Sequence, residues 1–508
     1  MGHAPTPLVT TYENYPAGVN MMWNTWIPAA GFVLWPVTAL WGAVASYNVV
    51  MTLGIVLGSW FAFLLIRRHV ASTLPAAAGG LVYGFCPMIM AQALGHEYLV
   101  LSAVTVPLVV MLVEELLVRQ RMRKPLLAFL IAAVGIVQFF ISEEIFVTEL
   151  IAAVVLGAVL AGAHHSEVRQ RARYAWRVLL PAAIAVGIVL VVPIAVQLTG
   201  PSRASGAIHS ADIFLTDPLN LVLPTSVQWI SPGLLQHLTT HFTGNASEWD
   251  GYLGVPLLGI LVYVLIRFWR VALVRVTGLT TIVIGILSLG PHLHGIGRVT
   301  PIPLPWWIPA HLPLLQDIQP NRLMLYVYLG AAIGLAFALQ HVAKLRFGAA
   351  RALALGVVAL IPLVPAFPLP NSPRPPLLPS SVLAAIPQDS VVLMAPWTDE
   401  TEATGMVLQA AADYRYRAIG GYYIGPDSNA FQVHDALSDI QQSGMAPPLN
   451  NTNRAAMLQE LTSDNVSVAV AFPSPHQGVF VAFLTTVLGA PPMVIDGSDV
   501  WLLGSTAR

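Results

Sequence analysis

The segment RQRARYAWRVLLPAAIAVGIVLVVPIAVQL, residues 169–198, places a basic cluster directly before a long apolar run. The apolar part, Val178 to Leu198, reaches the about 20 residues that an α-helix needs to cross the hydrocarbon core of a bilayer. Basic residues beside such a run stay on the cytoplasmic side. The segment therefore predicts a membrane-spanning helix that enters from the cytoplasm.

The composition of the whole chain is that of a polytopic membrane protein. Of its 508 residues, 56% are hydrophobic and 10% are charged, and the mean hydropathy is +0.70. A soluble domain has roughly 25% charged residues. The net charge of -1 and the dispersed basic residues argue against nucleic acid as a partner. The single cysteine, Cys86, excludes an intramolecular disulfide and a thiolate metal cluster.

Five basic patches separate the apolar runs and hold most of the 24 Lys and Arg residues. Because positively charged loops remain cytoplasmic, the connections between these patches are expected on the outer side, and so is everything after about Pro370. The functional site is therefore expected on the outer side of the membrane. The patches are Arg67 with Arg68, Arg119 to Lys124, Arg169 to Arg177, Arg267 to Arg275, and Lys344 to Arg351.

Apolar runs predict about ten membrane spans, several of them near the lower length limit. The expected fold class is mainly α: a polytopic α-helical membrane protein with a small C-terminal α/β domain. The predicted spans are approximately Tyr47 to Ile66, Leu74 to Gln92, Leu99 to Val118, Leu126 to Ile141, Ile145 to Ala163, Val178 to Leu198, Tyr252 to Phe268, Val276 to Gly290, Leu323 to His341, and Ala352 to Leu369.

The stretch from Trp26 to Val44 is also apolar but contains Pro28 and Pro36. If it crossed the membrane, Met1 would be cytoplasmic; if it lies in the interface or re-enters, Met1 is outside. The prolines and the tryptophans of this stretch favour an interfacial or re-entrant helical segment.

Composition divides the chain into three parts. Residues 1–369 form the membrane domain, with long outer loops at 201–250 and 291–322 that suit a cover over a membrane cavity. A Pro-rich spacer, residues 370–385, follows. Residues 386–508 have the patterning of a small extracytoplasmic α/β domain. It is expected to hold strands at 390–394 and 466–472, helices at 404–414 and 454–462, and a terminal hairpin at 492–495 and 500–503.

The first chemically suggestive stretch is YENYPAGVNMMWNT, residues 12–25. Prolines, a glycine, asparagines and aromatics near the membrane surface favour a rigid loop that hydrogen-bonds sugar hydroxyls and phosphate. Tyr15, Asn20 and Asn24 are the candidates for contact with a phosphorylated donor. The alternative is an ordinary interfacial turn.

A series of motifs gives the chain a resemblance to a known group. In order they are YPAGVNMMWNT, ASYNV, LVYGFCPMIMAQALGHEYL, EWDGYLGVPLLG, LSLGPHL and PLPWWIPAHLPLL, followed by Asn321 with Arg322 and by RYRAIGGYY. This order resembles the GT-C superfamily of polytopic glycosyltransferases, especially actinobacterial ones. The resemblance implies a membrane enzyme that transfers a sugar from a polyprenyl-phosphate carrier to a cell-envelope acceptor at the outer face of the plasma membrane.

One departure from that group concerns the catalytic carboxylate. The resemblance implies an Asp in the first outer loop after an N-terminal span, and this sequence contains neither, although Met1 to Pro7 resembles the tail of such a loop. We expect that the start has been assigned downstream of the true one. The alternative is an inactive relative that acts as a non-catalytic membrane scaffold.

Two acidic motifs lie at predicted outer ends of spans. In ALGHEYL, His96 and Glu97 are candidate ligands for a divalent cation, Mg or Mn, that screens the carrier phosphate; the alternative is a polar helix cap. In ISEEIF, Glu143 and Glu144 are weak catalytic candidates, and the alternative is a solvated hairpin tip. Glu149 lies deeper in the span, where a charge is costly.

Acidic and aromatic residues flank the large outer loop. A sugar site combines carboxylates that accept hydroxyl hydrogen bonds with an aromatic ring that stacks on a pyranose face. The expected sugar or acceptor residues are His209, Asp212, Glu248, Trp249 and Asp250. The alternative is that these loop acids are simply solvated.

Arg322 opens a span at the predicted outer face, contrary to the bias of basic residues for the inside. Its guanidinium is a candidate clamp for a lipid phosphate, and snorkelling to headgroups is the alternative. These residues suggest an inverting sugar transfer in which a carboxylate base deprotonates the acceptor. A lipid or polysaccharide transporter is the competing class, but the sequence has no internal repeat of the kind that transporters use.

Overall fold

A computed structural model describes residues 7–163, 168–204, 206–366, 379–399, 402–425 and 432–503. It divides into two compact units. The helical unit comprises Trp26–Leu190 and His209–Pro370, and the α/β unit comprises Met1–Thr25, Val191–Ile208 and Asn371–Arg508. The N-terminal residues, placed with the membrane domain by composition, therefore group with the C-terminal domain. Most of the expected spacer, 370–385, and most of Met1 to Pro7 lie outside the described residues.

Six helical stretches of the described residues are long and apolar enough to cross a membrane: Ala43–Arg67, Thr73–Gln92, Glu97–Arg119, Glu143–Ala163, Val168–Thr199 and Pro320–Ala343. In order they contain α2 (Ala43–Arg67), α3 (Thr73–Gly84) with α4 (Pro87–Gln92), α5 (Glu97–Ser102) with α6 (Thr105–Glu114) and η2 (Glu115–Arg119), α8 (Glu143–Ala163), α9 (Val168–Thr199), and η7 (Pro320–Leu323) with α13 (Met324–Ala343). Each overlaps one of the ten predicted spans.

The other four predicted spans coincide with shorter apolar helices. These are α7 (Lys124–Phe139), α11 (Val255–Arg267), α12 (Ala272–Ser288) and α14 (Gly348–Leu360). The shortest of them, at 13 residues, is about 20 Å long at 1.5 Å per residue. Helices α11 and α14, with 13 residues each, are shorter than the predicted spans, whereas α7 and α12, with 16 and 17 residues, are not.

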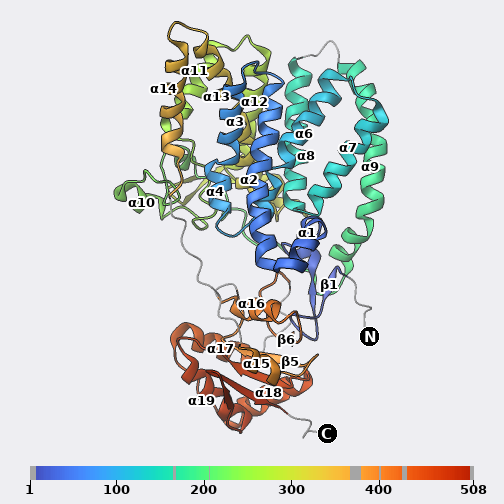
Figure 1. Ribbon diagram of the computed structural model, residues 1–508, viewed down its shortest axis with the longest axis vertical. Helices are drawn as coiled ribbons and strands as arrows, with labels where there is room; N and C mark the ends of the chain where they lie inside the picture. The colour runs from blue at the N-terminus through green and yellow to red at the C-terminus, as the bar shows by residue number, and fades with distance from the viewer. Residues whose placement is uncertain are drawn as a thin grey trace. The chain divides into compact units, whose positions relative to one another are not determined.

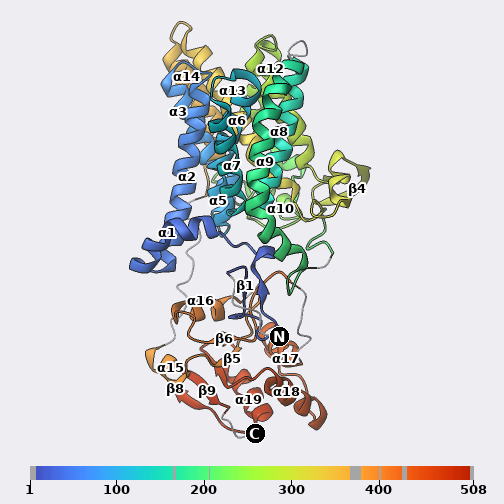
Figure 2. The ribbon, with the colours of Figure 1, turned by 90° about the vertical axis from the view of Figure 1, so that its right-hand side faces the viewer.

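The apolar stretch near the N-terminus forms a separate helix, α1 (Pro28–Trp41), of 14 residues. It ends at Gly42, whose φ of 84° is a conformation that favours glycine, and α2 begins directly afterwards. Figure 2 shows α1 turning away from the axis of α2. Phe32, Trp35 and Trp41 are largely exposed. A short, exposed, Trp-bearing helix favours the interfacial alternative over a full crossing.

The two ends of the helical unit differ in chemistry. Figure 1 shows the end of α2, the start of α9 and the α11–α12 and α13–α14 connections at one end, and these carry the basic patches. The starts of α8 and α13 lie at the opposite end. Helix α13 is mostly buried between its neighbours. One of these neighbours, α3, packs closely against α2: a Cβ at Gly84 of α3 would lie 1.8 Å from Ser59 Oγ of α2.

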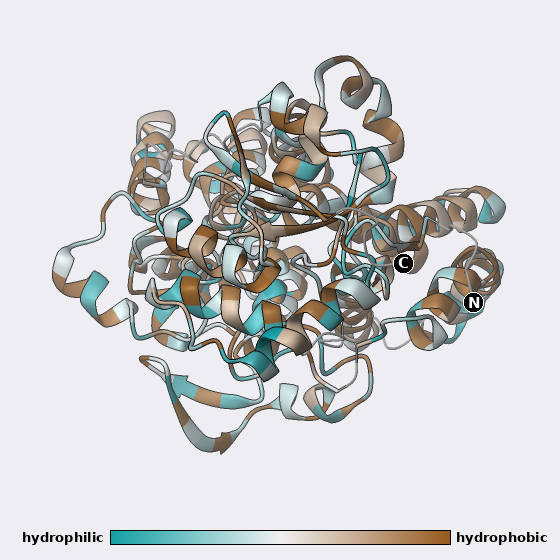
Figure 3. Cartoon of the chain, turned by 90° about the horizontal axis from the view of Figure 1, so that it is seen from below, coloured by the Kyte–Doolittle hydropathy of each residue, from teal (hydrophilic) through white to brown (hydrophobic). Residues whose placement is uncertain are grey.

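The α/β unit is built on one five-stranded sheet of order β6-β5-β7-β9-β8. Its strands are β5 (Val391–Ala395), β6 (Arg417–Ala418), β7 (Val468–Ala471), β8 (Met493–Ile495) and β9 (Ser498–Leu502). The pairs β5–β6 and β5–β7 are parallel, whereas β7–β9 and β8–β9 are antiparallel. Figure 3 shows the central strands in the hydrophobic colour, and both β5 and β7 are fully buried.

Helices surround this sheet: α15 (Ser380–Ala385), α16 (Thr404–Ala411), α17 (Gln432–Ser443), α18 (Asn451–Ser463) and α19 (Gln477–Leu488). The structure has strands, two of these helices and a terminal hairpin where sequence patterning placed them. Sequence patterning did not indicate α15, α17, α19 or β6. It also missed the N-terminal segment, in which β1 (Val9–Thr10) pairs with β2 (Val19–Asn20).

The N-terminal loop is held to the α/β unit by hydrogen bonds. Its backbone lies along β6, where Ala418 N donates to Tyr12 O and Tyr15 N donates to Ala418 O. Asn24 Nδ2 donates to Ile424 O at 3.3 Å, and Ile424 N donates to Asn24 Oδ1 at 2.7 Å. Asn20 Nδ2 donates to Val196 O. The asparagines expected to contact a donor therefore have partners within the chain.

Replacing Asn24 by Ala removes both bonds to Ile424, and we expect a loss of about 1–3 kcal/mol in local stability. Hydrogen exchange of the 418–424 backbone in the full-length protein should be about tenfold faster or more, since 1.4 kcal/mol is a factor of ten. Asn451→Ala, at an exposed position of α18, serves as the matched control. Equal exchange rates in the two variants would contradict the role of Asn24 in holding the 418–424 backbone.

Candidate functional site

Arg322 is the centre of the polar cluster in the helical unit. It lies in η7, immediately before α13, and is 1% exposed. Its Nε donates to Glu144 Oε2 at 3.3 Å, and its NH2 donates to Glu248 Oε1 at 3.0 Å. NH1 contacts the other oxygen of Glu248, and NH2 also contacts Gln319 Oε1. All three guanidinium nitrogens therefore have protein partners.

The two carboxylates come from distant parts of the sequence. Glu144 is in the first turn of α8 and also accepts a hydrogen bond from Gln319 N at 2.7 Å. Glu248 lies in the outer loop that leads to α11 and is 5% exposed. A buried guanidinium is stabilised when carboxylates satisfy its donors in this way. The cluster thus joins three segments at the end of the helical unit opposite the basic patches.

Side-chain amides complete the cluster. Asn321 Nδ2 donates to Glu248 Oε2 at 2.7 Å. Gln92 Nε2, at the end of α4, donates to Ser247 O at 2.9 Å, and it lies 3.2 Å from Glu248 Oε2 and 3.4 Å from Asp250 Oδ2. Because these three groups are acceptors, the Gln92 amide is oriented with its oxygen away from them. That oxygen, Oε1, lies 2.5 Å from His96 Nδ1.

The acids of the loop differ in protonation. Burial raises the pKa of Glu248, but Arg322 outweighs this effect and leaves the pKa below its usual value. Burial and then the Glu248 charge raise the pKa of Asp250 well above its usual value. Burial therefore favours the neutral form of Asp250. Within the described residues, Asp250 Oδ1 and Asn321 Oδ1 are buried without a hydrogen-bond partner.

His96 lies beside Glu248, with 3.9 Å between His96 Nδ1 and Glu248 Oε1. Burial lowers the pKa of His96, and the Glu248 charge opposes that shift only in part. The imidazole is therefore neutral near pH 7. Since Gln92 Oε1 can only accept, His96 Nδ1 carries the proton and Nε2 carries the free lone pair. The His96 side chain is 33% exposed.

The remaining candidates are not bonded to Arg322 among the described residues. Asp212 bonds to His292 Nδ1 and lies 3.3 Å from His294 Nε2, and His209 packs edge-on against Phe214. Trp249 Nε1 donates to Thr243 O. Glu97 and Glu143 each open a helix, and Glu149 is buried deeper in α8 with an unpartnered Oε1 among the described residues.

The proposed cation ligands do not form a suitable donor set. His96 Nδ1 is protonated toward Gln92, so it offers no lone pair there. The described part of the chain has no group of three or more His, Cys, Asp or Glu side chains placed to hold a metal ion. A divalent cation needs several oxygen or nitrogen ligands. The proposed mechanism therefore assigns no step to a metal ion.

Three amide residues of the cluster were not predicted from the sequence: Gln92, Gln319 and Asn321. A signal was present for two of them. Gln92 and His96 are four residues apart, the spacing that places side chains on one face of a helix. Asn321 directly precedes Arg322. Amides are common in ordinary loops, however, and only the carboxylates around them make them informative.

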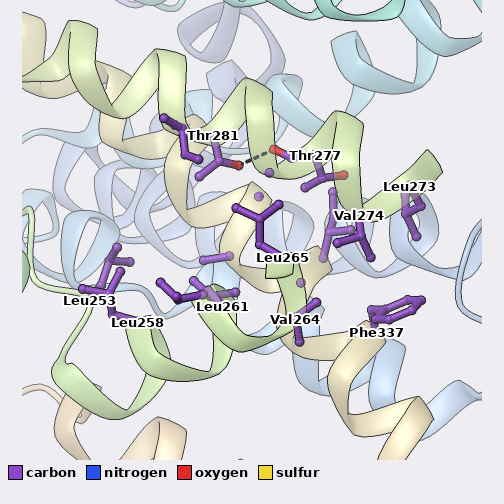
Figure 4. A pocket seen from close by; sticks show the side chains of 17 residues that line it. Leu253, Leu258, Leu261, Val264, Leu265, Leu273, Val274, Thr277, Thr281 and Phe337 are labelled. Atoms are coloured by element: carbon purple, nitrogen blue, oxygen red, sulfur yellow. Dashed lines mark hydrogen bonds between the residues drawn. The ribbon is translucent and has the colours of Figure 1, made fainter. Parts of the chain in front are cut away.

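A groove of about 150 Å³ lies between α11, α12 and α13 (Figure 4). Its lining runs from Leu253 and Leu258 to Phe337 and is almost entirely aliphatic. The hydroxyl of Thr281 bonds to Thr277 O within the same helix, so it leaves the groove apolar. Leu253 follows Asp250 by three residues. One end of the groove therefore begins close to the polar cluster.

Comparison with known proteins places the chain in a family. Residues 2–364 match the family model described as "Domain of unknown function (DUF6311)". The chain belongs to this family. No curated protein matches it. The DUF6311 chain is similar in fold to the cryo-EM structure of the arabinofuranosyltransferase AftD from Mycobacteria, with a TM-score of 0.53 and 14% identity.

The similarity to AftD covers 99% of this chain and 37% of that one, so this chain spans well under half the length of its structural neighbour. At this identity the match shows the fold alone. The DUF6311 description itself assigns no activity.

Neutralising Glu248 and neutralising Asp250 should have different effects on stability. Glu248→Gln takes away a main partner of a buried cation, which costs on the order of 3–5 kcal/mol. Asp250→Asn replaces an acid that is already protonated and should change little. The apparent melting temperature of the purified protein, at one heating rate, should fall clearly only for Glu248→Gln. Equal losses would show that Asp250 is ionised.

Proposed function

We propose that this chain is a membrane glycosyltransferase that moves a sugar from a polyprenyl-phosphate donor to a cell-envelope acceptor at the outer face of the plasma membrane. The observation that carries the proposal is the buried cluster of Arg322, Glu144 and Glu248 beside the partly exposed His96. The cluster lies opposite the basic end of the helical unit. If that basic end is cytoplasmic, the cluster faces the outside.

The same reasoning assigns the C-terminal domain to the outer compartment. The α13–α14 connection carries a basic patch, so α14 starts on the cytoplasmic side. The chain that follows α14 therefore continues from the outer end. We accordingly propose a multi-pass protein whose residues 386–508 are extracytoplasmic.

His96 is our candidate for the general base. A base must be unprotonated at working pH and must present a lone pair to the acceptor hydroxyl. The neutral tautomer with its lone pair on Nε2 meets the first condition, and the partial exposure of His96 meets the second. Glu248 is less suitable because Arg322 lowers its pKa. Asp250 is less suitable because burial favours its protonated form.

The transfer exchanges one bond at the anomeric carbon for another. The acceptor oxygen attacks the anomeric carbon while its proton moves to His96 Nε2. The bond from the anomeric carbon to the carrier phosphate breaks, and the phosphate leaves with the electron pair. The imidazolium that forms is stabilised by Glu248, whose Oε1 lies 3.9 Å from Nδ1. Arg322 holds Glu248 in place and so acts as a positioning residue.

The apolar groove between α11, α12 and α13 suits part of the carrier chain. A polyprenyl chain gains roughly 25 cal/mol per Å² of apolar surface that it buries away from water. Binding there would bring the phosphate end of the lipid toward Asp250 and Glu248, because Leu253 lies at the same end. A lipid-linked donor also explains why the sequence has no glycine-rich nucleotide loop.

His96→Asn should abolish most transfer without unfolding the protein. The Asn amide can keep the hydrogen bond to Gln92 but has no lone pair at the Nε2 position. We expect the rate of transfer from radiolabelled decaprenyl-phosphate sugars, in membranes that contain the full-length protein, to fall about 10²–10⁴-fold. Added imidazole should restore part of the activity to His96→Ala.

Asp464→Asn, a change at a half-buried position of the α/β unit, is the control for that assay. If the unmodified protein transfers none of the sugars offered, the proposed function fails. If it transfers sugar and His96→Asn is as active as the control, only the assignment of the base fails.

Filling the groove should affect the binding of long donors more than the chemistry. Leu261→Trp adds bulk at a lining position. We expect KM for a decaprenyl donor to rise about tenfold, while kcat with a short-chain donor stays the same. Trp at Leu353, an exposed position of α14, is the matched control. An equal effect on long and short donors would show that the groove does not hold the carrier.

A further inference from the structure

Three half-exposed tyrosines of the α/β unit lie in segments that carry or adjoin one acid, Glu13. Tyr12, Tyr414 and Tyr422 are 42%, 48% and 53% exposed. The rings of Tyr12 and Tyr414 pack edge to face with centroids 5.5 Å apart. Glu13 follows Tyr12 in the chain, and Tyr422 follows Gly421. We call the three tyrosines, Glu13 and Gly421 together the tyrosine–Glu13 surface.

Hydrogen bonds fix the two segments that carry this surface. Tyr12 O accepts from Ala418 N at 2.8 Å and also from Gln409 Nε2 at 2.8 Å. Asn14 N donates to Gly420 O at 3.2 Å. These bonds lie on both sides of Glu13 in the sequence. The aromatic rings and the acid are therefore held on a rigid backbone, which lowers the entropic cost of binding a ligand.

The Glu13 side chain lies against the backbone of Gly421. A Cβ at Gly421 would be 3.1 Å from both Glu13 Cβ and Glu13 Oε2, so the glycine provides the space that the acid occupies. Burial raises the pKa of Glu13 to about 7. The structure gives its carboxyl no hydrogen bond or ion pair with any residue that it describes. A partly buried acid without a partner is costly unless a ligand supplies one.

We propose that the tyrosine–Glu13 surface is a binding subsite for a neutral glycan. Tyrosine rings of this exposure can stack on the apolar faces of pyranose or furanose rings. The carboxyl of Glu13 can accept hydrogen bonds from hydroxyl groups and, when protonated, can donate one. This subsite extends the proposed function because it gives the α/β unit a role in holding a sugar polymer.

A cationic ligand is the other chemistry that acids and aromatic rings recognise. Two observations favour the neutral glycan. A carboxyl that is half protonated near neutral pH gives a cation little charge to pair with. The neighbouring ring of Tyr15 already faces a cation, Arg417, at 5.4 Å. The hydroxyl groups of a glycan, in contrast, pair with both donors and acceptors, and a half-protonated carboxyl provides both.

The test measures binding without any donor lipid. The full-length protein in nanodiscs is mixed with neutral malto-, manno- and arabino-oligosaccharides, and saturation-transfer NMR reports the affinity for each. We expect at least one of them to bind. We expect Tyr422→Ala and Glu13→Ala each to weaken that binding about fivefold to tenfold, because each removes one of the contacts that hold the sugar. Glu13→Gln should lose less, since an amide still bonds to hydroxyls.

Met445→Ala and Asp464→Asn are the controls, because both lie elsewhere in the sequence of the α/β unit, Met445 at an exposed position and Asp464 at a half-buried one. Unchanged melting temperatures would show that the variants are folded. The proposal is overturned if none of the three oligosaccharides binds, if the site variants bind as well as the controls, or if tetramethylammonium binds there and the oligosaccharides do not. Absence of sugar transfer in the enzymatic assay would leave this binding result untouched.

Discussion

A guanidinium with 1% exposure constrains the end of the helical unit that lies opposite the basic patches. Burying an unpaired charge costs several kcal/mol, and breaking one partner from a buried pair costs on the order of 3–5 kcal/mol. Arg322 therefore requires Glu144 and Glu248 to be close to it. Those partners are 178 and 74 residues away in the sequence. One side chain thus ties the start of α8, the loop before α11 and the start of α13 into one site.

The same interaction orients groups that do not touch Arg322. Glu248 is held by the guanidinium, and it in turn helps to orient the Gln92 amide. Gln92 then determines which nitrogen of His96 carries the proton. A functional imidazole of this kind depends on partners that fix its tautomer. The chain of contacts from Arg322 through Glu248 and Gln92 to His96 therefore carries an electrostatic constraint to a partly exposed side chain.

Much of the helical architecture could be predicted from the sequence, because apolar run length and basic patches are direct consequences of bilayer physics. Arg322 was also recognisable, since an arginine at the outer end of a span contradicts the usual bias. Its partners were not. Glu248 was one acid among several in a long loop, and its pairing depends on packing between distant segments. The asparagines of the N-terminal loop were predicted to be functional, yet Asn24 is bonded to the backbone of Ile424.

The phosphate-clamp hypothesis for Arg322 also changes once its partners are known. A lipid phosphate would have to displace Glu248 or Glu144 from a guanidinium whose nitrogens are all engaged. Even without a charge on Asp250, two carboxylates face one cation, and their charge would repel an approaching phosphate. The arrangement is better suited to stabilising a cation that appears during the reaction. In the proposed transfer, the imidazolium formed when His96 accepts a proton beside Glu248 would be such a cation.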